Sequence, residues 1–169
     1  MHNIQFVPEC YAETEMVKQI LFIENVDYLN HAGGIQEVSR ILKKRDMKGY
    51  LNIGFIDKDK YNTPPYFDGF EIIEDHNLVS FKKHPNTNDY LFIAKPAIEK
   101  FIFKQLVEIE KSPSDYDLPN DFIGFCKKLK KIRIQYDEGY KNMISDLRDS
   151  KTSGITFIIN KITDLRSRL

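Results

Sequence analysis

The chain has 169 residues, which is enough for one domain with a sizeable buried core. It carries 25 basic and 25 acidic side chains, so its formal net charge is zero and no overall field attracts nucleic acid or membranes. The hydrophobic fraction of 41%, with 12 Phe and 9 Tyr, is typical of a folded globular protein. No apolar run approaches the roughly 20 residues of a membrane span, and the N-terminus lacks a secretory signal pattern. We therefore expect a cytoplasmic protein with no membrane partner.

The first elements of the chain alternate between strand and helix patterns. Residues 3–7 are β-prone and stop at Pro8, so a first strand delivers Glu9 at its end. From Thr14 the apolar residues follow helical spacing, and Glu13 lies near the start of this helix. An acid at a helix N-terminus commonly complements the helix dipole. This is the alternative to a functional role for Glu13.

A second strand is expected at residues 26–29, followed by a loop and a helix that begins near Ile35. The loop contains His31, Gly33 and Gly34. Paired glycines let backbone amides approach an anion at a helix N-terminus, so these three residues are candidate phosphate-binding positions. The spacing is neither a P-loop nor a dinucleotide-binding fingerprint. An incidental loop histidine is the simpler interpretation of His31.

The third strand ends in two carboxylates. Its sequence, LNIGFIDKDK at residues 51–60, is an apolar run that stops at Asp57 and Asp59. In an open α/β sheet, ligands bind beyond the carboxyl ends of the strands, and alternate strand positions share a face. Carboxylate oxygens suit a hard cation such as Mg²⁺. Both aspartates are therefore candidate metal ligands, with a solvated turn of mixed charge as the alternative.

This order of elements predicts an α/β fold with a mostly parallel central sheet flanked by helices. Phe55 and Ile56 point to opposite faces of the third strand, so both faces need cover and the strand should be interior. We expect its neighbours to be the strands that carry Val7 and Tyr28.

The middle of the chain is expected to add short strands and one helix. Lys82 follows one of these strands, and its ammonium group is a candidate phosphate contact. Glu99 lies in the first turn of the helix, where it is either a late metal ligand or an acid favoured by the helix dipole. The strands are predicted at residues 70–73, 77–81 and 90–94, and the helix at residues 98–109.

A Pro- and Asp-rich linker at residues 112–118 divides the chain into two parts. We expect an α/β part at residues 1–111 and a C-terminal helical extension at residues 112–169, packed together as one compact unit. The extension contains the only dense basic cluster. A solvated helix face and contact with a nucleic-acid backbone explain this cluster equally well. Its candidate backbone contacts are Lys127, Lys128, Lys130 and Lys131.

The pattern of acids resembles the Toprim domain over residues 3–105. Glu9 follows a first strand, Glu13 enters a helix four residues later, a second loop contains glycine, and Asp57 and Asp59 follow a third strand. Toprim domains occur in topoisomerases, bacterial primases and OLD-like nucleases, and the chain is most like small stand-alone Toprim-like proteins of bacteria.

The resemblance implies a Mg²⁺- or Mn²⁺-dependent enzyme that acts on nucleic-acid phosphodiesters, most readily a nuclease. In the family the glutamate, here Glu9, transfers a proton, and the aspartates, here Asp57 and Asp59, hold the metal. Glu13 and Glu99 would help to hold it. Acids gathered at one sheet edge also repel one another, so at least one pKa should be raised unless metal is bound.

One departure from the family pattern favours a different function. Toprim domains usually have glycine directly after the first glutamate, where this chain has Cys10 and Tyr11. The alternative is a non-catalytic Toprim-like interaction module that works with a partner protein, for which an ATPase is one candidate. A sugar transferase with a D-x-D motif is a third interpretation, but the chain is short for that class. Cys10 and Cys126 have no metal-ligand spacing and imply no disulfide.

Overall fold

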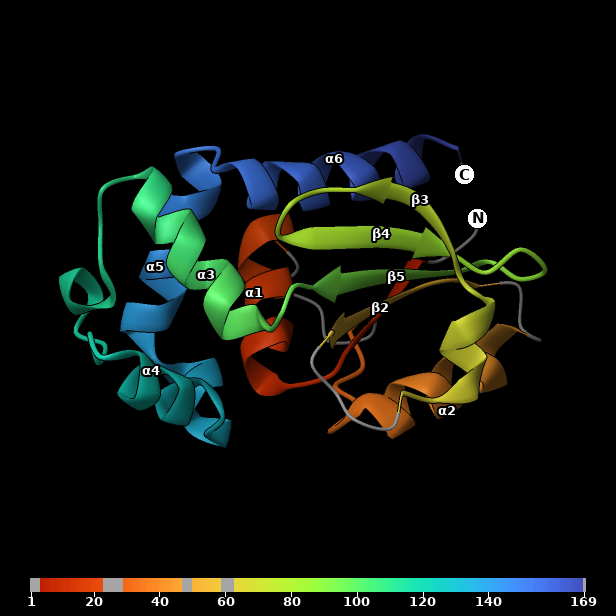
Figure 1. Cartoon of the computed structure of the whole chain (residues 1–169), viewed down its shortest axis with the longest axis horizontal. Coiled ribbons are helices and arrows are strands. Elements are labelled where there is room, and N and C mark those ends of the chain that lie inside the picture. The colour runs from red at the N-terminus through yellow and green to blue at the C-terminus, as the bar shows by residue number, and fades with distance from the viewer. Residues whose placement is uncertain (1–3, 23–28, 47–49, 59–62, 169) are drawn as a thin grey trace.

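The computed structural model describes residues 4–22, 29–46, 50–58 and 63–168, and it shows an α/β fold, as predicted (Figure 1). Five strands form one sheet, and helices lie on both of its faces. With η marking a 3-10 helix, the elements in chain order are β1 (Ile4–Pro8), α1 (Tyr11–Leu21), α2 (Ile35–Asp46), β2 (Leu51–Asp57), η2 (Pro65–Gly69), β3 (Glu71–Asp75), β4 (Val79–Lys83), β5 (Asp89–Ala94), α3 (Ile98–Glu108), η3 (Pro113–Tyr116), α4 (Phe122–Leu129), η4 (Ile132–Tyr136), α5 (Glu138–Asp149) and α6 (Ser153–Ser167).

The sheet is mixed rather than mostly parallel. Its strand order is β1-β2-β5-β4-β3, in which β2 pairs in parallel with β1 and β5, whereas β4 pairs antiparallel with β5 and β3 (Figure 1). The antiparallel half follows from chain connectivity. Short loops join β3 to β4 and β4 to β5, and such loops permit hairpins, whereas a parallel pair needs a long crossover.

The strand β2 is interior, as predicted, and one of its neighbours is β1 with Val7. Its other neighbour is β5, where the sequence had suggested the strand that contains Tyr28. Tyr28 itself lies outside the described residues. Leu29 forms an isolated parallel bridge with Phe6 of β1, on the edge of β1 that faces away from β2.

Each face of the sheet has its own cover, because side chains alternate along the strands. Ile56 and Leu91 pack with α2 on one face. On the other face Phe55 and Phe92 belong to a larger core that includes residues of α1, α3, α5 and α6. The C-terminal helices contribute Tyr140, Met143, Ile144, Leu147, Ile155, Ile158, Ile162 and Leu165 to that core.

The sheet and the C-terminal helices therefore bury their apolar side chains in one continuous cluster. This arrangement places α5 and α3 beside the start of α1, near the carboxyl ends of β1 and β2 (Figure 1). Within the described parts of the chain, no helix has the length and apolar character that crossing a membrane requires.

Candidate functional site: an acidic sheet edge

The carboxyl ends of β1, β2 and β5 meet the N-termini of three helices. The Glu9 amide donates to the carbonyl of Phe55, so the chain after β1 remains tied to β2. The Gly33 amide donates to the Glu9 carbonyl, which places the loop before α2 at the same edge. The N-terminus of α3 is held there by Asp57, as described below. Helix N-termini carry positive partial charge, so this edge favours carboxylates and other anions.

Glu13 is buried at the start of α1, with 1% of its surface exposed. Its Oε2 atom accepts hydrogen bonds from the amides of Glu9 (2.7 Å) and Cys10 (2.9 Å). Burial raises the pKa of the Glu13 carboxyl well above its usual range, and the negative charges of Asp57 and Glu9 raise it further. This raised pKa agrees with the repulsion that the sequence predicted for clustered acids.

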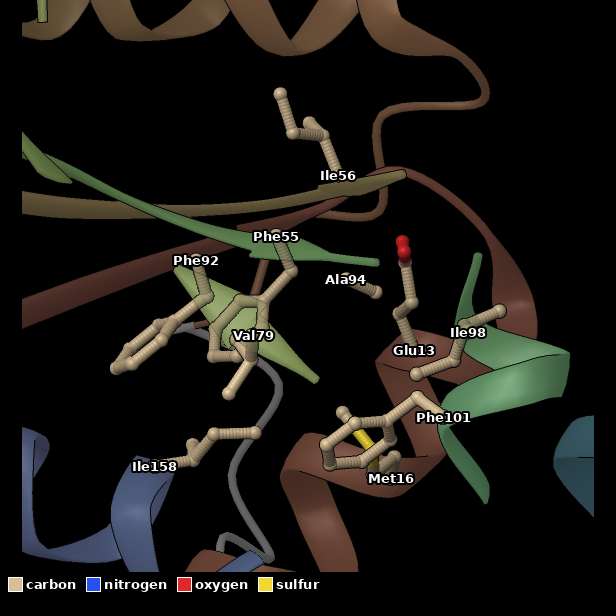
Figure 2. Close-up of a pocket in the computed structure, with 10 residues that line it drawn as sticks. All are labelled: Glu13, Met16, Phe55, Ile56, Val79, Phe92, Ala94, Ile98, Phe101 and Ile158. Atoms are coloured by element: carbon tan, nitrogen blue, oxygen red, sulfur yellow. The ribbon is translucent and has the colours of Figure 1, made fainter. Parts of the chain in front are cut away.

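A small apolar cavity lies beside Glu13. Figure 2 shows the Glu13 carboxyl between Ala94 and Ile98, at the sheet edge, with apolar side chains below it. The cavity volume is about 10 Å³, which is roughly the room that one water molecule needs. Met16 and Phe101 line its floor, so the carboxyl has little solvent to stabilise a charge.

Glu9 and Asp57 are adjacent across β1 and β2. The Asp57 amide donates to Oε2 of Glu9 at 3.3 Å, and Oδ1 of Asp57 accepts from the Ile98 amide at 2.8 Å. Glu9 is 6% exposed, and Asp57 is half-buried. Asp57 thus holds the first turn of α3 against the end of β2. Both acids have local structural roles in addition to any chemical role.

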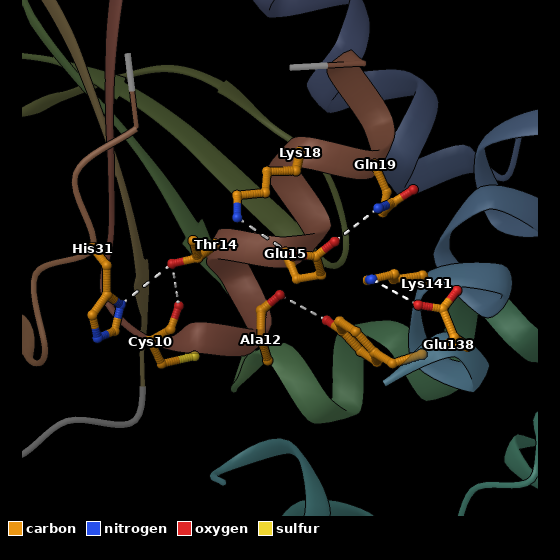
Figure 3. Close-up of polar contacts among 10 residues, drawn as sticks. Cys10, Ala12, Thr14, Glu15, Lys18, Gln19, His31, Glu138 and Lys141 are labelled. Carbon is orange, nitrogen blue, oxygen red and sulfur yellow. Dashed lines mark hydrogen bonds and ion pairs between the residues drawn. The ribbon is translucent and has the colours of Figure 1, made fainter. Parts of the chain in front are cut away.

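The loop with His31 also lies at this edge. The His31 ring stacks on Tyr11 with a centroid distance of 3.8 Å. Its Nδ1 atom lies 3.3 Å from the Thr14 hydroxyl (Figure 3). Burial lowers the pKa of His31, which favours a neutral ring. Gly33 and Gly34 have φ angles of 80° and 145°, a backbone region that side chains rarely tolerate. The structure therefore brings these three predicted residues to the edge that contains Glu9.

Cys10 occupies the N-cap position of α1, and it forms a capping box with Glu13. The helix begins at Tyr11, three residues before the Thr14 start that the sequence suggested. Burial raises the pKa of the Cys10 thiol, and the charges of Glu13 and Asp57 raise it further. A raised pKa favours the protonated thiol, which is a weaker nucleophile than the thiolate.

A second group of buried polar side chains extends from this edge toward the helical extension. Glu15 is 3% exposed, accepts a hydrogen bond from Gln19 at 2.7 Å and lies 3.7 Å from the Lys18 ammonium (Figure 3). Tyr140 is fully buried, and its hydroxyl donates to the Ala12 carbonyl at 2.8 Å.

Sequence reasoning placed Glu15 near the start of the first helix and Tyr140 on an apolar helix face, but it gave neither residue a role at the site. Nothing local could have revealed the contact of Tyr140 with Ala12, since this partner is 128 positions away. The burial of Glu13 did have a signal. Glu13, Met16 and Val17 follow the i, i+3, i+4 spacing of one helix face, and the latter two are apolar.

Glu99 lies in the first turn of α3 and is 6% exposed. Burial is the main cause of the raised pKa of Cys126 on α4 and of Tyr140 on α5, and the negative charge of Glu99 raises both pKa values further. Glu99 therefore lies within electrostatic reach of the helical extension. The Ile98 amide, one residue earlier, is the group that contacts Asp57.

The predicted cations are not gathered at the acidic edge. Lys82 on β4 is the register partner of Leu91 on β5. Leu91 lies three residues before Ala94, which is at the carboxyl end of β5. Lys82 is therefore roughly 10 Å away from that end, measured along the strand. Lys128 is half-buried and forms an ion pair with Asp137 at 2.6 Å. The exposed lysines of this cluster, in and just after α4, are Lys127, Lys130 and Lys131.

The carboxylates of Glu9 and Asp57 fit the donor chemistry of Mg²⁺, which takes one or two carboxylates together with water and phosphate oxygens. Among the described residues, no group of three or more His, Cys, Asp or Glu side chains is placed to hold a metal ion. Asp59, the second predicted aspartate ligand, lies outside the described residues. Glu13 uses one carboxyl oxygen for two backbone amides, which suits a positioning role.

A scan against protein-family models, a search of curated proteins and a search of solved structures each found no match to this chain. The functional argument therefore starts from the geometry of the acidic edge.

Proposed function

We propose that this chain is a Toprim-like, Mg²⁺- or Mn²⁺-dependent enzyme that acts on nucleic-acid phosphodiesters in the cytoplasm, most readily as a nuclease. The observation that carries the proposal is the juxtaposition of Glu9 and Asp57 at the carboxyl edge of a parallel strand pair. Three helix N-termini share that edge, and ligands of α/β sheets bind in this position.

The chemistry follows from the charges involved. A reacting phosphodiester accumulates negative charge on its oxygens, and helix N-termini can offset part of it. When bound, a divalent cation would supply further positive charge, and Asp57 and Asp59 would hold it. Glu9 would transfer a proton at the attacking or leaving oxygen. Glu13 would act as a positioning residue, because it holds the backbone amide of Glu9 in place.

Exposed lysines in and just after α4 favour contact with a nucleic-acid backbone. Lys127, Lys130 and Lys131 are exposed and form no ion pair among the residues that the structure describes. The helix α4 packs on α3 through the edge-to-face contact of Phe122 with Phe103. Asp57 in turn holds the N-terminus of α3 through the Ile98 amide, so α3 links α4 to the acidic edge.

A second function, an interaction module that works with a partner protein, is favoured by the hydrogen bonds of the acids. Glu9, Glu13 and Asp57 each accept from backbone amides, so they stabilise the fold whether or not catalysis occurs. Cys10 also stands where related domains have glycine. In this function the purified protein would show no metal-dependent cleavage.

Cleavage assays separate the two functions. Wild type, Glu9→Gln and Asp57→Asn are incubated with single-stranded and duplex DNA and RNA in Mg²⁺, Mn²⁺ or chelator. We expect Glu9→Gln to lower turnover by about 10²- to 10⁴-fold while metal-dependent binding persists. Asp57→Asn should weaken both binding and turnover. Glu138→Gln changes an exposed glutamate on α5 and serves as the matched control.

Two results would contradict the proposal. Undiminished cleavage by Glu9→Gln would exclude the assigned proton transfer. Wild-type inactivity on every substrate and metal would move the assignment to the interaction module.

A further inference from the structure

A second pocket lies at the far end of the sheet from the acids, between α6 and strands β3 to β5. Its volume is about 140 Å³. The helix α6 runs alongside β3 and β4 in Figure 1, and the Lys161–Glu74 ion pair confirms this contact. The lining side chains are Ile73, Phe81, Lys83, Tyr90, Lys161, Asp164, Leu165 and Arg168.

The pocket is built by regular secondary structure. Lys83 and Tyr90 are directly paired across β4 and β5, so their side chains lie on the same face. The α6 side of the pocket comes from Lys161, Leu165 and Arg168, together with Asp164. Their i, i+3, i+4, i+7 spacing gives one helix stripe that faces the sheet. Rigid elements thus position the polar groups on both sides.

The lining carries more positive than negative charge. Lys83 and Arg168 form no ion pair within the described part of the chain, whereas Lys161 is paired with Glu74. Asp164 is the one acid in the lining. Cations are expected at a helix C-terminus, which accounts for Arg168 in part. That argument does not apply to Lys83, which lies on β4 between its register partners Glu71 on β3 and Tyr90 on β5.

Tyr90 adds a phenol hydroxyl to the lining of the pocket. It is 8% exposed, and its hydroxyl pKa is raised by burial and lowered in part by the charge of Arg168. Arg168 and Tyr90 both line the pocket, so both can contact one bound group. A guanidinium, an ammonium and a phenol together donate several hydrogen bonds to a multivalent oxyanion.

We propose that this pocket binds the phosphate group of a small anion, either inorganic phosphate or a small phosphomonoester. The volume is well below the roughly 300 to 1,000 Å³ of sites for drug-sized ligands, so the organic part must be small. The site is separate from the acidic edge, because Lys83 and Tyr90 lie at the opposite ends of β4 and β5 from Val79 and Ala94.

Calorimetric titration at constant ionic strength tests this site. Inorganic phosphate and glycerol phosphate are titrated into the full chain, its Lys83→Gln and Arg168→Gln variants, and the double variant. We expect saturable binding to wild type, about 10- to 100-fold weaker binding to each single variant, and none to the double variant. Arg168→Lys keeps the charge but loses the fork geometry, so its affinity should be intermediate.

The control variants are Lys104→Gln and Arg133→Gln, which remove exposed cations outside the pocket. They should bind phosphate like wild type. An equal loss in these controls would show general charge attraction and would overturn the proposal, as would binding that survives in the double variant or no binding to wild type. Tighter binding of glycerol phosphate than of phosphate would assign the apolar wall to the organic part of the ligand. Circular dichroism confirms that each variant is folded.

Discussion

Asp57 and Glu9 are 48 positions apart in the sequence, yet the backbone amide of Asp57 donates a hydrogen bond to Oε2 of Glu9. The parallel pairing of β1 with β2 brings them together, because Pro8 and Phe55 are register partners just before the two acids. The two acidic residues are neighbours only in the folded chain. Their repulsion, and any gain from a cation that relieves it, therefore belongs to the folded state.

The first prediction follows from this proximity. Mg²⁺ or Mn²⁺ should raise the melting temperature, and linkage gives about 2.7 kcal/mol of stabilisation at a hundredfold excess over the dissociation constant. The combined change of Asp57 and Asp59 to Asn should abolish the shift, as measured by differential scanning calorimetry. Asp68→Asn, an exposed change on η2, should retain the full shift. A shift that survives the double change would place the metal elsewhere.

Glu13 predicts a pH dependence of stability. Because its pKa is raised in the folded state, the folded chain holds the proton more tightly than the unfolded chain. Below about pH 4.5, the ordinary pKa of the group, Glu13 is protonated in both the folded and the unfolded state, so the raised pKa does not lower the free energy of unfolding. As the pH rises above that value, the unfolded state releases its proton first, so the free energy of unfolding falls until the folded pKa is passed.

The Glu13→Gln variant lacks this titration. Its free energy of unfolding should therefore rise relative to wild type as the pH increases from about 4.5. Urea denaturation across the pH range measures the difference. Glu71→Gln removes an exposed glutamate of β3 and should show no such trend. A difference that stays constant with pH would contradict the raised pKa.

The contact between Tyr140 and Ala12 predicts a modest loss of stability. Tyr140→Phe removes a buried hydroxyl that donates to the Ala12 carbonyl, so the free energy of unfolding should fall by about 0.5 to 1.5 kcal/mol. The denaturation midpoint should decrease while the slope stays unchanged. Tyr136→Phe is the matched control, because this side chain is 73% exposed. Equal effects of the two changes would show that the buried hydrogen bond contributes nothing specific.

Gly54 lies where β2 packs so closely against its neighbours that a larger side chain should destabilise the fold. A Cβ atom at this position would lie 2.7 Å from Cδ2 of Leu91 and 3.2 Å from Cγ1 of Val38. Gly54→Ala should therefore cost about 1 to 3 kcal/mol through overpacking. Leu91→Ala alone should also destabilise, but the double variant should lose less than the sum, because the new methyl group occupies part of the vacated space. Simple additivity in urea denaturation would contradict this explanation.

The sequence alone was sufficient for the features that depend on local periodicity. Apolar residues on both faces of residues 51–57 predicted an interior strand, and β2 is interior because burial on both faces is the only arrangement that removes Phe55 and Ile56 from water. Helical spacing likewise predicted α2 and α3. The Gly33–Gly34 pair predicted a loop before α2, and the structure adds that both glycines have positive φ angles.

The tertiary structure decided which elements became neighbours. The residue pattern of a strand shows which of its faces are apolar, but it does not show which strands pair. The sequence therefore did not predict that β5 pairs with β2, or that β4 runs antiparallel to β5. That reversal moves Lys82 away from the acids. The contact of Tyr140 with Ala12 and the pocket between α6 and strands β3 to β5 also arise from contacts between distant segments. Such contacts form because all elements compete to bury apolar surface at once, a global condition that no local pattern encodes.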